Sequence, residues 1–345
     1  MNIRNMTIEE LGRDLVYLGY EKYRCKQLFT WLHKNVIDNI DDATNLSKDL
    51  RKTLIEKYDF SMPSIYKEYK SKIDDTKKYL ILLNDDDIIE SVLMKYSFGY
   101  SICISSQVGC NMGCKFCAST IGGMKRNLET YELLSQIYLI QKYNNIKVSN
   151  IVIMGLGEPL LNYDNIIRFL KIINDKFGQN IGLRNITLST CGIIPNIEKL
   201  MNENLPINLA LSLHASNDEI RKKIMPISNK YKLNDVLNSI LKYFEKTNRR
   251  ITFEYCLIKD INDSKNDAYN LIKLFKDSFK HTHVDFNVNL IPVNEVKENS
   301  FKRPDNITIS NFKNILENNN ISVTIRRELG KDISGSCGQL RASVK

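Results

Sequence analysis

The stretch of sequence that decides the fold is Ser101-Ile-Cys-Ile-Ser-Ser-Gln-Val-Gly-Cys110-Asn-Met-Gly-Cys114-Lys-Phe-Cys117. Residues 101–106 have the pattern of a β-strand, and the loop after them holds three cysteines in the spacing C-x-x-x-C-x-x-C. Three thiolates in one short loop can bind an iron–sulfur cluster or zinc. The sequence therefore predicts a metal or redox site directly after a strand.

Strand-like and helix-like segments alternate from this stretch onward. The strand-like runs are residues 101–106, 150–154, 184–189, 207–213, 250–258, 284–291 and 322–325. Helical patterns lie between most of them, at residues 130–143, 162–174, 233–244 and 266–279. This alternation indicates βα units around a parallel sheet. The predicted fold class is α/β. About six units favour a full or partial barrel rather than a doubly wound sheet, and we expect a partial (β/α)6 barrel formed by residues 101–300. In such a barrel, chemistry is expected at the carboxyl ends of the strands.

Three further parts are predicted around the barrel. Residues 1–60 have the pattern of short helices, with a capping-box start at Thr7, and are expected to form a small RNA-docking domain. Residues 61–100 predict a β-hairpin linker, because two apolar runs flank the polar turn at residues 84–87. Residues 301–345 form a C-terminal extension with eight Lys/Arg and four Asp/Glu, hence 8 − 4 = +4.

Composition bounds the class of protein. The chain has 345 residues, of which 43% are hydrophobic and 26% charged, so a folded globular protein is expected. No apolar run is long enough for a membrane span, and the first residues do not resemble a secretion signal. These features predict a soluble cytoplasmic protein with no membrane partner. A net charge of +9 is compatible with a polyanionic partner such as RNA.

The cysteine loop leaves two metal sites to choose between. A structural zinc ion usually has four protein ligands, often two pairs, and no second pair or histidine lies near this loop. An iron–sulfur cluster held by only three cysteines leaves one iron open to another ligand. The missing fourth ligand favours the cluster, and zinc remains the alternative.

Two more strand ends carry groups suited to binding a small molecule. After the second strand comes Gly155-Leu-Gly157-Glu158, where the glycines allow a tight turn and the carboxylate can accept from an ammonium group. The third and fourth strands end near Ser189 and near Ser212-Leu-His214. Alone, each of these features is weak evidence, but their order after the cysteine loop strengthens it.

Several motifs in fixed order resemble one family of enzymes. They are Val108-Gly-Cys-Asn-Met-Gly-Cys-Lys-Phe-Cys-Ala, Gly155-Leu-Gly-Glu-Pro-Leu-Leu-Asn, Leu209-Ala-Leu-Ser-Leu-His-Ala, Met225-Pro-Ile, Val288-Asn-Leu-Ile-Pro-Val-Asn and Cys337-Gly-Gln-Leu. Together they resemble the RlmN family of radical S-adenosylmethionine (SAM) RNA methyltransferases, from the helical N-terminus to the last residues. The resemblance implies a partial (β/α)6 radical-SAM barrel, a 4Fe–4S cluster and S-adenosylmethionine.

The resemblance also implies a substrate and partners. It implies methylation of carbon 2 of an adenine in 23S rRNA, at the peptidyl-transferase centre, and in tRNA at the adenine 3′ of the anticodon. An electron donor such as flavodoxin or ferredoxin is implied as well. Because carbon 2 of adenine is electrophilic, it cannot displace the methyl group of S-adenosylmethionine directly, and a radical carrier is required.

Residue roles follow from the same resemblance. Cys337 is implied to accept a methyl group and then to link protein and RNA, Glu90 to accept the adenine proton, and Cys103 to release the product by forming a transient disulfide with Cys337. The cluster ligands implied are Cys110, Cys114 and Cys117. The cofactor-binding residues implied are Gly157, Glu158, Ser189, Ser212, Leu213, His214 and Asn294. Arg326 and Arg327, with the basic tail, are expected to hold RNA phosphates.

Two alternative functions remain open, and one stretch of the sequence departs from the family's pattern. A related enzyme, Cfr, would methylate carbon 8, although the run Pro159 to Asn162 after Glu158 favours RlmN. A non-catalytic zinc-dependent RNA-binding protein is the alternative from another class. Cys25, Cys191 and Cys256 match no catalytic motif and are taken as structural. Ser334-Gly-Ser336 departs from the family's usual residues before its last cysteine, which leaves the docking of that loop open.

Overall fold

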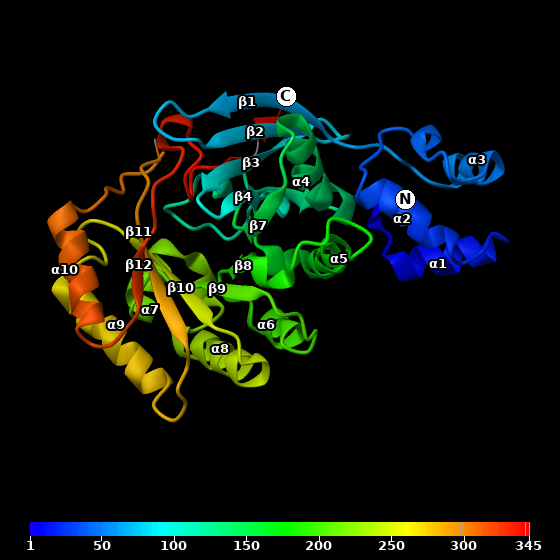
Figure 1. Ribbon diagram of the computed structural model, residues 1–345. Helices are drawn as coiled ribbons and strands as arrows, with labels where there is room; N and C mark the ends of the chain where they lie inside the picture. Colours follow the sequence, from blue (N-terminus) through cyan, green and yellow to red (C-terminus); the bar gives the residue numbers. More distant parts are fainter. Residues whose placement is uncertain (297, 342, 345) are drawn as a thin grey trace.

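A curved sheet with seven parallel strands forms the centre of the molecule (Figure 1). The computed structural model describes residues 1–296, 298–341 and 343–344. The parallel strands are β4 (Gly99–Ile104), β7 (Val148–Ile153), β8 (Ile186–Thr190), β9 (Asn208–Ser212), β10 (Ile251–Leu257), β11 (Phe286–Pro292) and β12 (Val323–Ile325). They pair in this order, and within the described residues β12 does not pair with β4, so the barrel is partial. The predicted fold class is confirmed.

Helices connect successive parallel strands and cover the outside of the sheet (Figure 1). They are α4 (Thr130–Asn144), α5 (Tyr163–Asn174), α6 (Ile194–Leu200), α7 (Asp218–Ile224), α8 (Leu233–Thr247), α9 (Lys265–Ser278) and α10 (Asn306–Glu317). Local sequence explains their ends: Ser264 and Asp267 form a capping box at the start of α9, and Asn248 ends α8 in the left-handed conformation. The apolar residues of α8, such as Val236 and Ile240, are fully buried.

An antiparallel extension continues the same sheet at its first edge. It consists of β1 (Ser64–Lys70), β2 (Lys77–Leu82) and β3 (Asp87–Tyr96), and β3 pairs antiparallel with β4. The hairpin expected upstream of the barrel is thus β2 and β3, built into the barrel sheet. The chain end returns to this region, because β13 (Ser343–Val344) pairs with β3.

Three helices at the N-terminus pack beside the barrel. They are α1 (Ile8–Tyr17), α2 (Arg24–His33) and α3 (Lys48–Lys57), and α1 begins with a capping box of Thr7 and Glu10. The buried His33 Nδ1 lies 2.9 Å from the Tyr138 hydroxyl of α4, which joins the helical region to the barrel. Burial lowers the pKa of His33 to about 3. One continuous core includes apolar residues of both parts.

Two short strands and several 3-10 helices lie between the main elements. The two-stranded sheet β5 (Gln107–Gly109) and β6 (Met124–Asn127) flanks the cysteine loop. The 3-10 helices are η1 (Ile3–Asn5), η2 (Ile40–Asp42), η3 (Ala118–Thr120), η4 (Pro159–Asn162), η5 (Leu183–Asn185), η6 (Pro226–Asn229) and η7 (Lys331–Ile333). Among the described helices, none has both the length and the apolar character needed to cross a membrane.

Candidate active site

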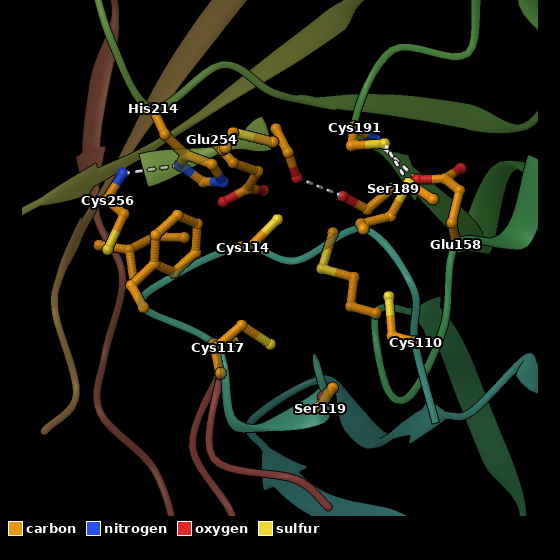
Figure 2. A pocket seen from close by; sticks show the side chains of 18 of the residues that line it. Cys110, Cys114, Cys117, Ser119, Glu158, Ser189, Cys191, His214, Glu254 and Cys256 are labelled. Atoms are coloured by element: carbon orange, nitrogen blue, oxygen red, sulfur yellow. Dashed lines mark hydrogen bonds between the residues drawn. The ribbon is translucent and has the colours of Figure 1, made fainter. Parts of the chain in front are cut away.

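A cavity opens at the carboxyl ends of the parallel strands, where the alternating pattern predicts chemistry (Figure 2). Residues from the loop after β4, from the ends of β7 to β11 and from the C-terminal segment line it. Ten of the residues expected at the site lie in its wall: Cys110, Cys114, Cys117, Gly157, Glu158, Ser189, Ser212, His214, Asn294 and Cys337. Positions far apart in the sequence therefore meet in one place.

Residues 110–117, the cysteine loop, present three thiols to this cavity. Figure 2 shows the side chains of Cys110, Cys114 and Cys117 around the same open space. The loop is held at its base by the Cys110 amide, which donates to Gly123 at 3.0 Å, and near its tip by the Lys115 amide, which donates to Ile224 at 2.9 Å. Burial raises the pKa of each of the three thiols, to about 12 for Cys110. Metal binding at the loop would therefore release protons.

The spacing of these thiols bears on the kind of metal. Within residues 1–296, 298–341 and 343–344, no three His, Cys, Asp or Glu side chains come close enough together to share one metal ion. The ligands of a tetrahedral zinc site meet at one ion, whereas thiolates that hold an iron–sulfur cluster bind separate irons.

The turn after β7 brings backbone into the wall of the cavity. Gly157 has φ of 100°, and a Cβ atom there would lie 2.5 Å from Gln107 Cβ, so only glycine fits without rearrangement. Glu158 follows, almost fully buried, and its carboxylate accepts from the amides of Leu160 at 3.0 Å and Cys191 at 2.7 Å. Burial raises the pKa of Glu158. The carboxylate is thereby fixed at the rim of the cysteine loop.

His214 presents one ring nitrogen to the cavity. Its Nδ1 accepts from the Cys256 amide at 2.9 Å, so the neutral ring carries its proton on Nε2. Burial lowers the pKa of His214 to about 3, which keeps the ring neutral. Phe116 of the cysteine loop packs edge-on against it, with ring centroids 4.9 Å apart. His214 can therefore donate one hydrogen bond to a ligand.

Leu213 contributes differently from its neighbours. Its side chain is fully buried and does not line the cavity, but its carbonyl accepts from the Nε of Arg221 at 3.0 Å. The same guanidinium donates to the carbonyls of Ser212 at 3.0 Å and Cys191 at 2.8 Å. Arg221 thus holds the ends of β8 and β9 in register around the cavity.

Two buried acceptors in the wall have hydrogen-bonding capacity left over. Among the described residues, no donor is within hydrogen-bond reach of Glu254 Oε2 or of Asn294 Oδ1. Both residues line the cavity. A buried acceptor without a donor is costly, so the wall suits a ligand that carries N–H or O–H groups. Figure 2 places Glu254 beside His214, across the open space from Cys110.

Residues 330–341, which we call the Cys337 segment, close the cavity on another side. The side-chain amide of Asn294 donates to the carbonyl of Cys337 at 2.9 Å. The Ala118 amide donates to Gly338 at 2.7 Å, and the Ser119 hydroxyl donates to Leu340 at 2.9 Å. These contacts place Cys337 in the same cavity as the cysteine loop.

Cys103 lies next to this cavity but does not line it. It stands on β4, opposite Val92 of β3 and Val152 of β7. Burial, reinforced by the nearby Cys337, raises the pKa of Cys103 to about 12. The pKa of Arg326 is raised, first by Cys337 and further by Glu254 and Cys103. Arg326 lies in the cavity wall, with 23% of its side chain exposed; its expected contact with an RNA phosphate stays a prediction.

Glu90 also lies outside the cavity wall. It stands on β3, with its side chain 6% exposed, and its Oε2 accepts from the amide of Arg341 at 3.1 Å. Lys78 of β2 forms an ion pair with its other oxygen at 3.2 Å. Burial raises the pKa of Glu90, and Lys78 acts against this rise. Glu90 is therefore linked to the cavity through the Cys337 segment.

The remaining cysteines are divided between core and site. Cys25 is buried in α2, whereas Cys191 and Cys256 line the cavity although the sequence suggested only structural roles. The sulfur of Cys191 lies 3.4 Å from that of Met112 in the cysteine loop. All eight cysteines are free thiols, so the disulfide between Cys103 and Cys337 is not formed in this state.

Sequence reasoning missed Glu254, Arg221 and Lys78. One signal was available for Glu254, a carboxylate within the apolar strand Ile251–Leu257. No comparable signal marks Arg221 or Lys78, because the groups they contact are distant in the sequence or are backbone carbonyls.

Comparison with known families covers most of the chain. Residues 104–272 match the family model of the radical SAM superfamily. Residues 1–59 match the model described as the ribosomal RNA large subunit methyltransferase N-terminal domain. The two matches correspond to the barrel and to the helical N-terminal region.

Individual relatives are similar over nearly the whole length. A protein of Lachnoclostridium phytofermentans named "Probable dual-specificity RNA methyltransferase RlmN" is 51% identical, over 99% of this chain and 95% of that protein. One of the same name from Clostridium botulinum (strain Alaska E43 / Type E3) is 52% identical, over 99% and 96%. The crystal structure of a radical SAM methyltransferase from Sphaerobacter thermophilus superimposes with a TM-score of 0.91 at 35% identity, over 99% of both chains.

Proposed function

Since the chain belongs to the RlmN family of dual-specificity RNA methyltransferases within the radical SAM superfamily, we propose that it methylates carbon 2 of one adenine in 23S rRNA, at the peptidyl-transferase centre, and of the adenine 3′ of the anticodon in tRNAs. Membership of this family excludes the zinc-dependent, non-catalytic alternative. The observation that carries the proposal is the meeting of Cys337 with the three-cysteine loop in one cavity, with Cys103 beside it.

The enzyme uses a 4Fe–4S cluster and S-adenosylmethionine, the cofactors of its superfamily. The donor set fits both: Cys110, Cys114 and Cys117 would hold three irons. Glu254 Oε2 and Asn294 Oδ1, which accept no hydrogen bond within the described residues, suit the N–H and O–H groups of the nucleoside. When bound, these cofactors supply a methyl group and, after one-electron reduction by a donor such as flavodoxin or ferredoxin, a radical able to remove a hydrogen atom from that methyl group.

Further contacts to S-adenosylmethionine are proposed at the strand ends. Glu158 and the backbone at Gly157 would face its amine, while Ser189, Ser212 and the backbone at Leu213 would lie near its polar groups. His214 would donate from Nε2, since its other ring nitrogen already accepts from Cys256. Each of these residues except Leu213 lines the cavity, which supports the assignment.

Cys337 would carry the transferred carbon. Its sulfur accepts the methyl group, and the carbon then bonds to adenine, so that protein and RNA are covalently linked. The guanidinium of Arg326 shares the cavity wall with this sulfur, and Cys337 raises the pKa of Arg326. Arg326 would also stay in place for the later steps, because the ion pair of Nη1 with Glu254, at 3.6 Å, holds it in the wall.

Release of the product would use Glu90 and Cys103. Glu90 would accept the proton from carbon 2 of the adenine while the radical adduct gives one electron back to the oxidised cluster, and Cys103 would then attack the sulfur of Cys337. The carbon–sulfur bond breaks, the carbon takes up a proton, and a Cys103–Cys337 disulfide remains until thiol exchange reduces it. Both thiols are free in the present structure.

RNA docking is proposed for parts outside the cavity. The N-terminal helices over residues 1–60 expose Tyr17 and Tyr23 beside basic side chains, a combination suited to RNA. The extension over 61–100 and the barrel over 101–300 would hold the base, and the C-terminal extension over 301–345 would bring Cys337 to it. Arg327, exposed beside Arg326, would contact a phosphate; Lys345 of the basic tail lies outside the described residues.

One experiment tests the chemistry of this proposal. RNA treated with the reduced, reconstituted enzyme is digested and its nucleosides are identified by mass spectrometry, and the intact mass of the protein is measured in parallel. We expect 2-methyladenosine and one added methyl group on Cys337. Exclusive formation of 8-methyladenosine would overturn the proposed target carbon in favour of Cfr-type activity.

A further inference from the structure

Lys78 is a buried cation that the proposed reaction does not yet use. Its side chain is 9% exposed, although lysine is almost never buried without a partner. It stands on β2, and Glu90 stands on β3 opposite Leu80, so Lys78 and Glu90 are diagonal neighbours on one face of the sheet. Burying an ammonium group here is costly unless a specific anion accompanies it.

The partners of Lys78 connect two parts of the active site. Its Nζ lies 3.2 Å from Glu90 Oε1 and donates to the carbonyl of Ser334 at 3.4 Å. The ring of Tyr69 lies under the ammonium group, 5.2 Å away, and closes the remaining side. Ser334 belongs to the Cys337 segment, so one ammonium group touches both the carboxylate and the segment that brings Cys337.

The surroundings of Glu90 contain few other charges. From the C-terminal side, Arg341 donates its backbone amide to Oε2 at 3.1 Å, and its guanidinium interacts with Glu90 from a distance while pairing with Glu298. From the β4 side, the hydroxyl of Ser105 donates to the backbone carbonyl of Glu90 at 2.7 Å and adds no charge. Lys78 is thus the cation in direct contact with the carboxylate.

Burial and the ion pair with Lys78 have opposite effects on the pKa of Glu90. Burial favours the neutral carboxylic acid, which cannot accept a proton, whereas a cation 3.2 Å away favours the carboxylate. A proton acceptor must be ionised when the substrate arrives. The site therefore needs a cation at this position.

We propose that Lys78 is a positioning residue for proton removal: it keeps Glu90 ionised and, through Ser334, ties that carboxylate to the Cys337 segment. The inference rests on the role proposed above for Glu90 in the reaction. Lys78 touches no substrate; it acts through Glu90.

The test separates proton removal from the earlier steps. Enzyme already methylated on Cys337 is mixed with RNA, S-adenosylmethionine and a one-electron reductant, and the protein–RNA adduct and the released RNA are followed over a range of pH. For Lys78→Met we expect normal adduct formation but slower release. The acidic limb of the release rate should move to higher pH by at least about one unit, tenfold in proton concentration, because an adjacent cation shifts a carboxyl by this much or more.

Two matched variants accompany this measurement. Lys78→Arg keeps the charge and should restore the wild-type pH profile. Lys77→Met removes the neighbouring lysine, whose Nζ donates to Asn144 at 2.6 Å, and should leave the profile unchanged. An unmoved acidic limb in Lys78→Met, in protein of normal iron content, would overturn the inference.

A spectroscopic measurement makes the outcome independent of turnover and of the stability of Lys78→Met. The infrared difference spectrum of the metal-free chain against Glu90→Gln isolates the Glu90 carboxyl. We expect the carboxylate band at neutral pH, and the band of the protonated acid would refute the role of Lys78. If instead Glu90→Gln releases RNA normally, the proposed role of Glu90 fails, and the same difference spectrum recorded in a Lys78→Gln background still shows whether Lys78 controls the ionisation of Glu90.

Discussion

The cysteine loop and the Cys337 segment supply sulfur to the same cavity, but they are built differently. Residues 110–117 follow the first barrel strand directly, and the small sheet of β5 and β6 closes their base. The three thiols owe their proximity to spacing along eight residues. This part of the site is local, and a change within the loop should affect mainly the metal.

The Cys337 segment depends on contacts from distant parts of the chain. Its start is held by Asp74 Oδ2, which accepts from the Gly330 amide at 2.9 Å, and by Asp332, which accepts from the Lys72 amide at 2.7 Å. Its middle and end are held by Asn294, Ser119 and Glu90. The segment includes Ser334, with φ of 51°, in the stretch that departs from the family pattern. Nothing within its own sequence would place it in the cavity.

The difference suits the two proposed roles, a fixed cluster at the cysteine loop and a carbon carrier at Cys337. A cluster needs thiols whose separation does not change, and a short loop anchored by a strand provides this. A residue that carries a group between two partners must be held in place and still be able to move. Many separate hydrogen bonds allow both, because each of them is individually weak. Asn294 and Glu90, proposed for cofactor and substrate, both contact the segment in the present state.

The largest effect is expected from a substitution in the cysteine loop. Cys114→Ala should lose nearly all bound iron and reduce methylation by more than about a hundredfold, since even residues that only orient metal ligands change affinity by about 10–100-fold. Iron analysis and the visible absorption of anaerobically reconstituted protein measure this. Cys25→Ala, in α2, is the matched control and should keep its iron. Full iron content in Cys114→Ala would contradict the assignment of the loop.

A smaller effect is expected at Arg326, which lines the cavity together with the cysteine loop and Cys337. Arg326→Met should slow methyl transfer to Cys337 by roughly tenfold or more, because it removes the positive charge that shares the cavity wall with this sulfur. Iron content should not change. Time-resolved intact mass spectrometry follows the added methyl group.

Arg327→Met is the control for this charge. Arg327 is exposed, so its loss should weaken RNA binding and leave methylation of Cys337 at the wild-type rate. Equal slowing in both variants would argue against a specific role of Arg326 in the cavity.

Weakening one anchor of the Cys337 segment should reduce turnover only modestly. Asp332→Asn weakens the contacts to the Ser71 hydroxyl and the Lys72 amide, both at 2.7 Å, and we expect a decrease of about two- to fivefold, since exposed contacts contribute little singly. Asp305→Asn, at the exposed N-cap of α10, is a comparable change away from the segment. A loss of iron in Asp332→Asn would show that the two parts are not separable.

The smallest effect is one of pH on the Cys337 segment. The pKa of Asp332 is lowered, first by the hydrogen bond from Lys72. A carboxylate with a lowered pKa holds its contacts fully above the value of the unfolded chain, about 4, and loses them as pH falls through the folded value.

Hydrogen exchange of residues 330–341, corrected for the intrinsic pH dependence, measures this. Protection at the start of the segment, around Gly330 and Asp332, should stay constant from neutral pH down to about pH 5 and decrease below about pH 4. A decrease already near neutral pH would mean that other groups control this anchor.

Much of the architecture could be predicted because it depends on periodic or local patterns. Strand periodicity and capping residues placed the parallel strands and four helices within a few residues of their observed ends. The hairpin of β2 and β3 was predicted from its polar turn, but its pairing with β4 was not, because strand pairing across a sheet edge leaves little trace in one strand's sequence.

The placement of Arg326 illustrates what a linear pattern misses. Arg326 and Arg327 look equivalent as a basic pair in the sequence. In the folded chain Arg326 forms an ion pair with Glu254 and lines the cavity, whereas Arg327 is exposed.

The alternating fold, the three-cysteine loop and the order of the motifs can be recognised from the chain alone, because these depend on period, spacing and succession along it. The pairs of buried charges, Lys78 with Glu90 and Arg326 with Glu254, became visible only in the folded molecule. A buried charge is tolerated only with its partner, and that partner is chosen by the packing of distant strands, which no local pattern records.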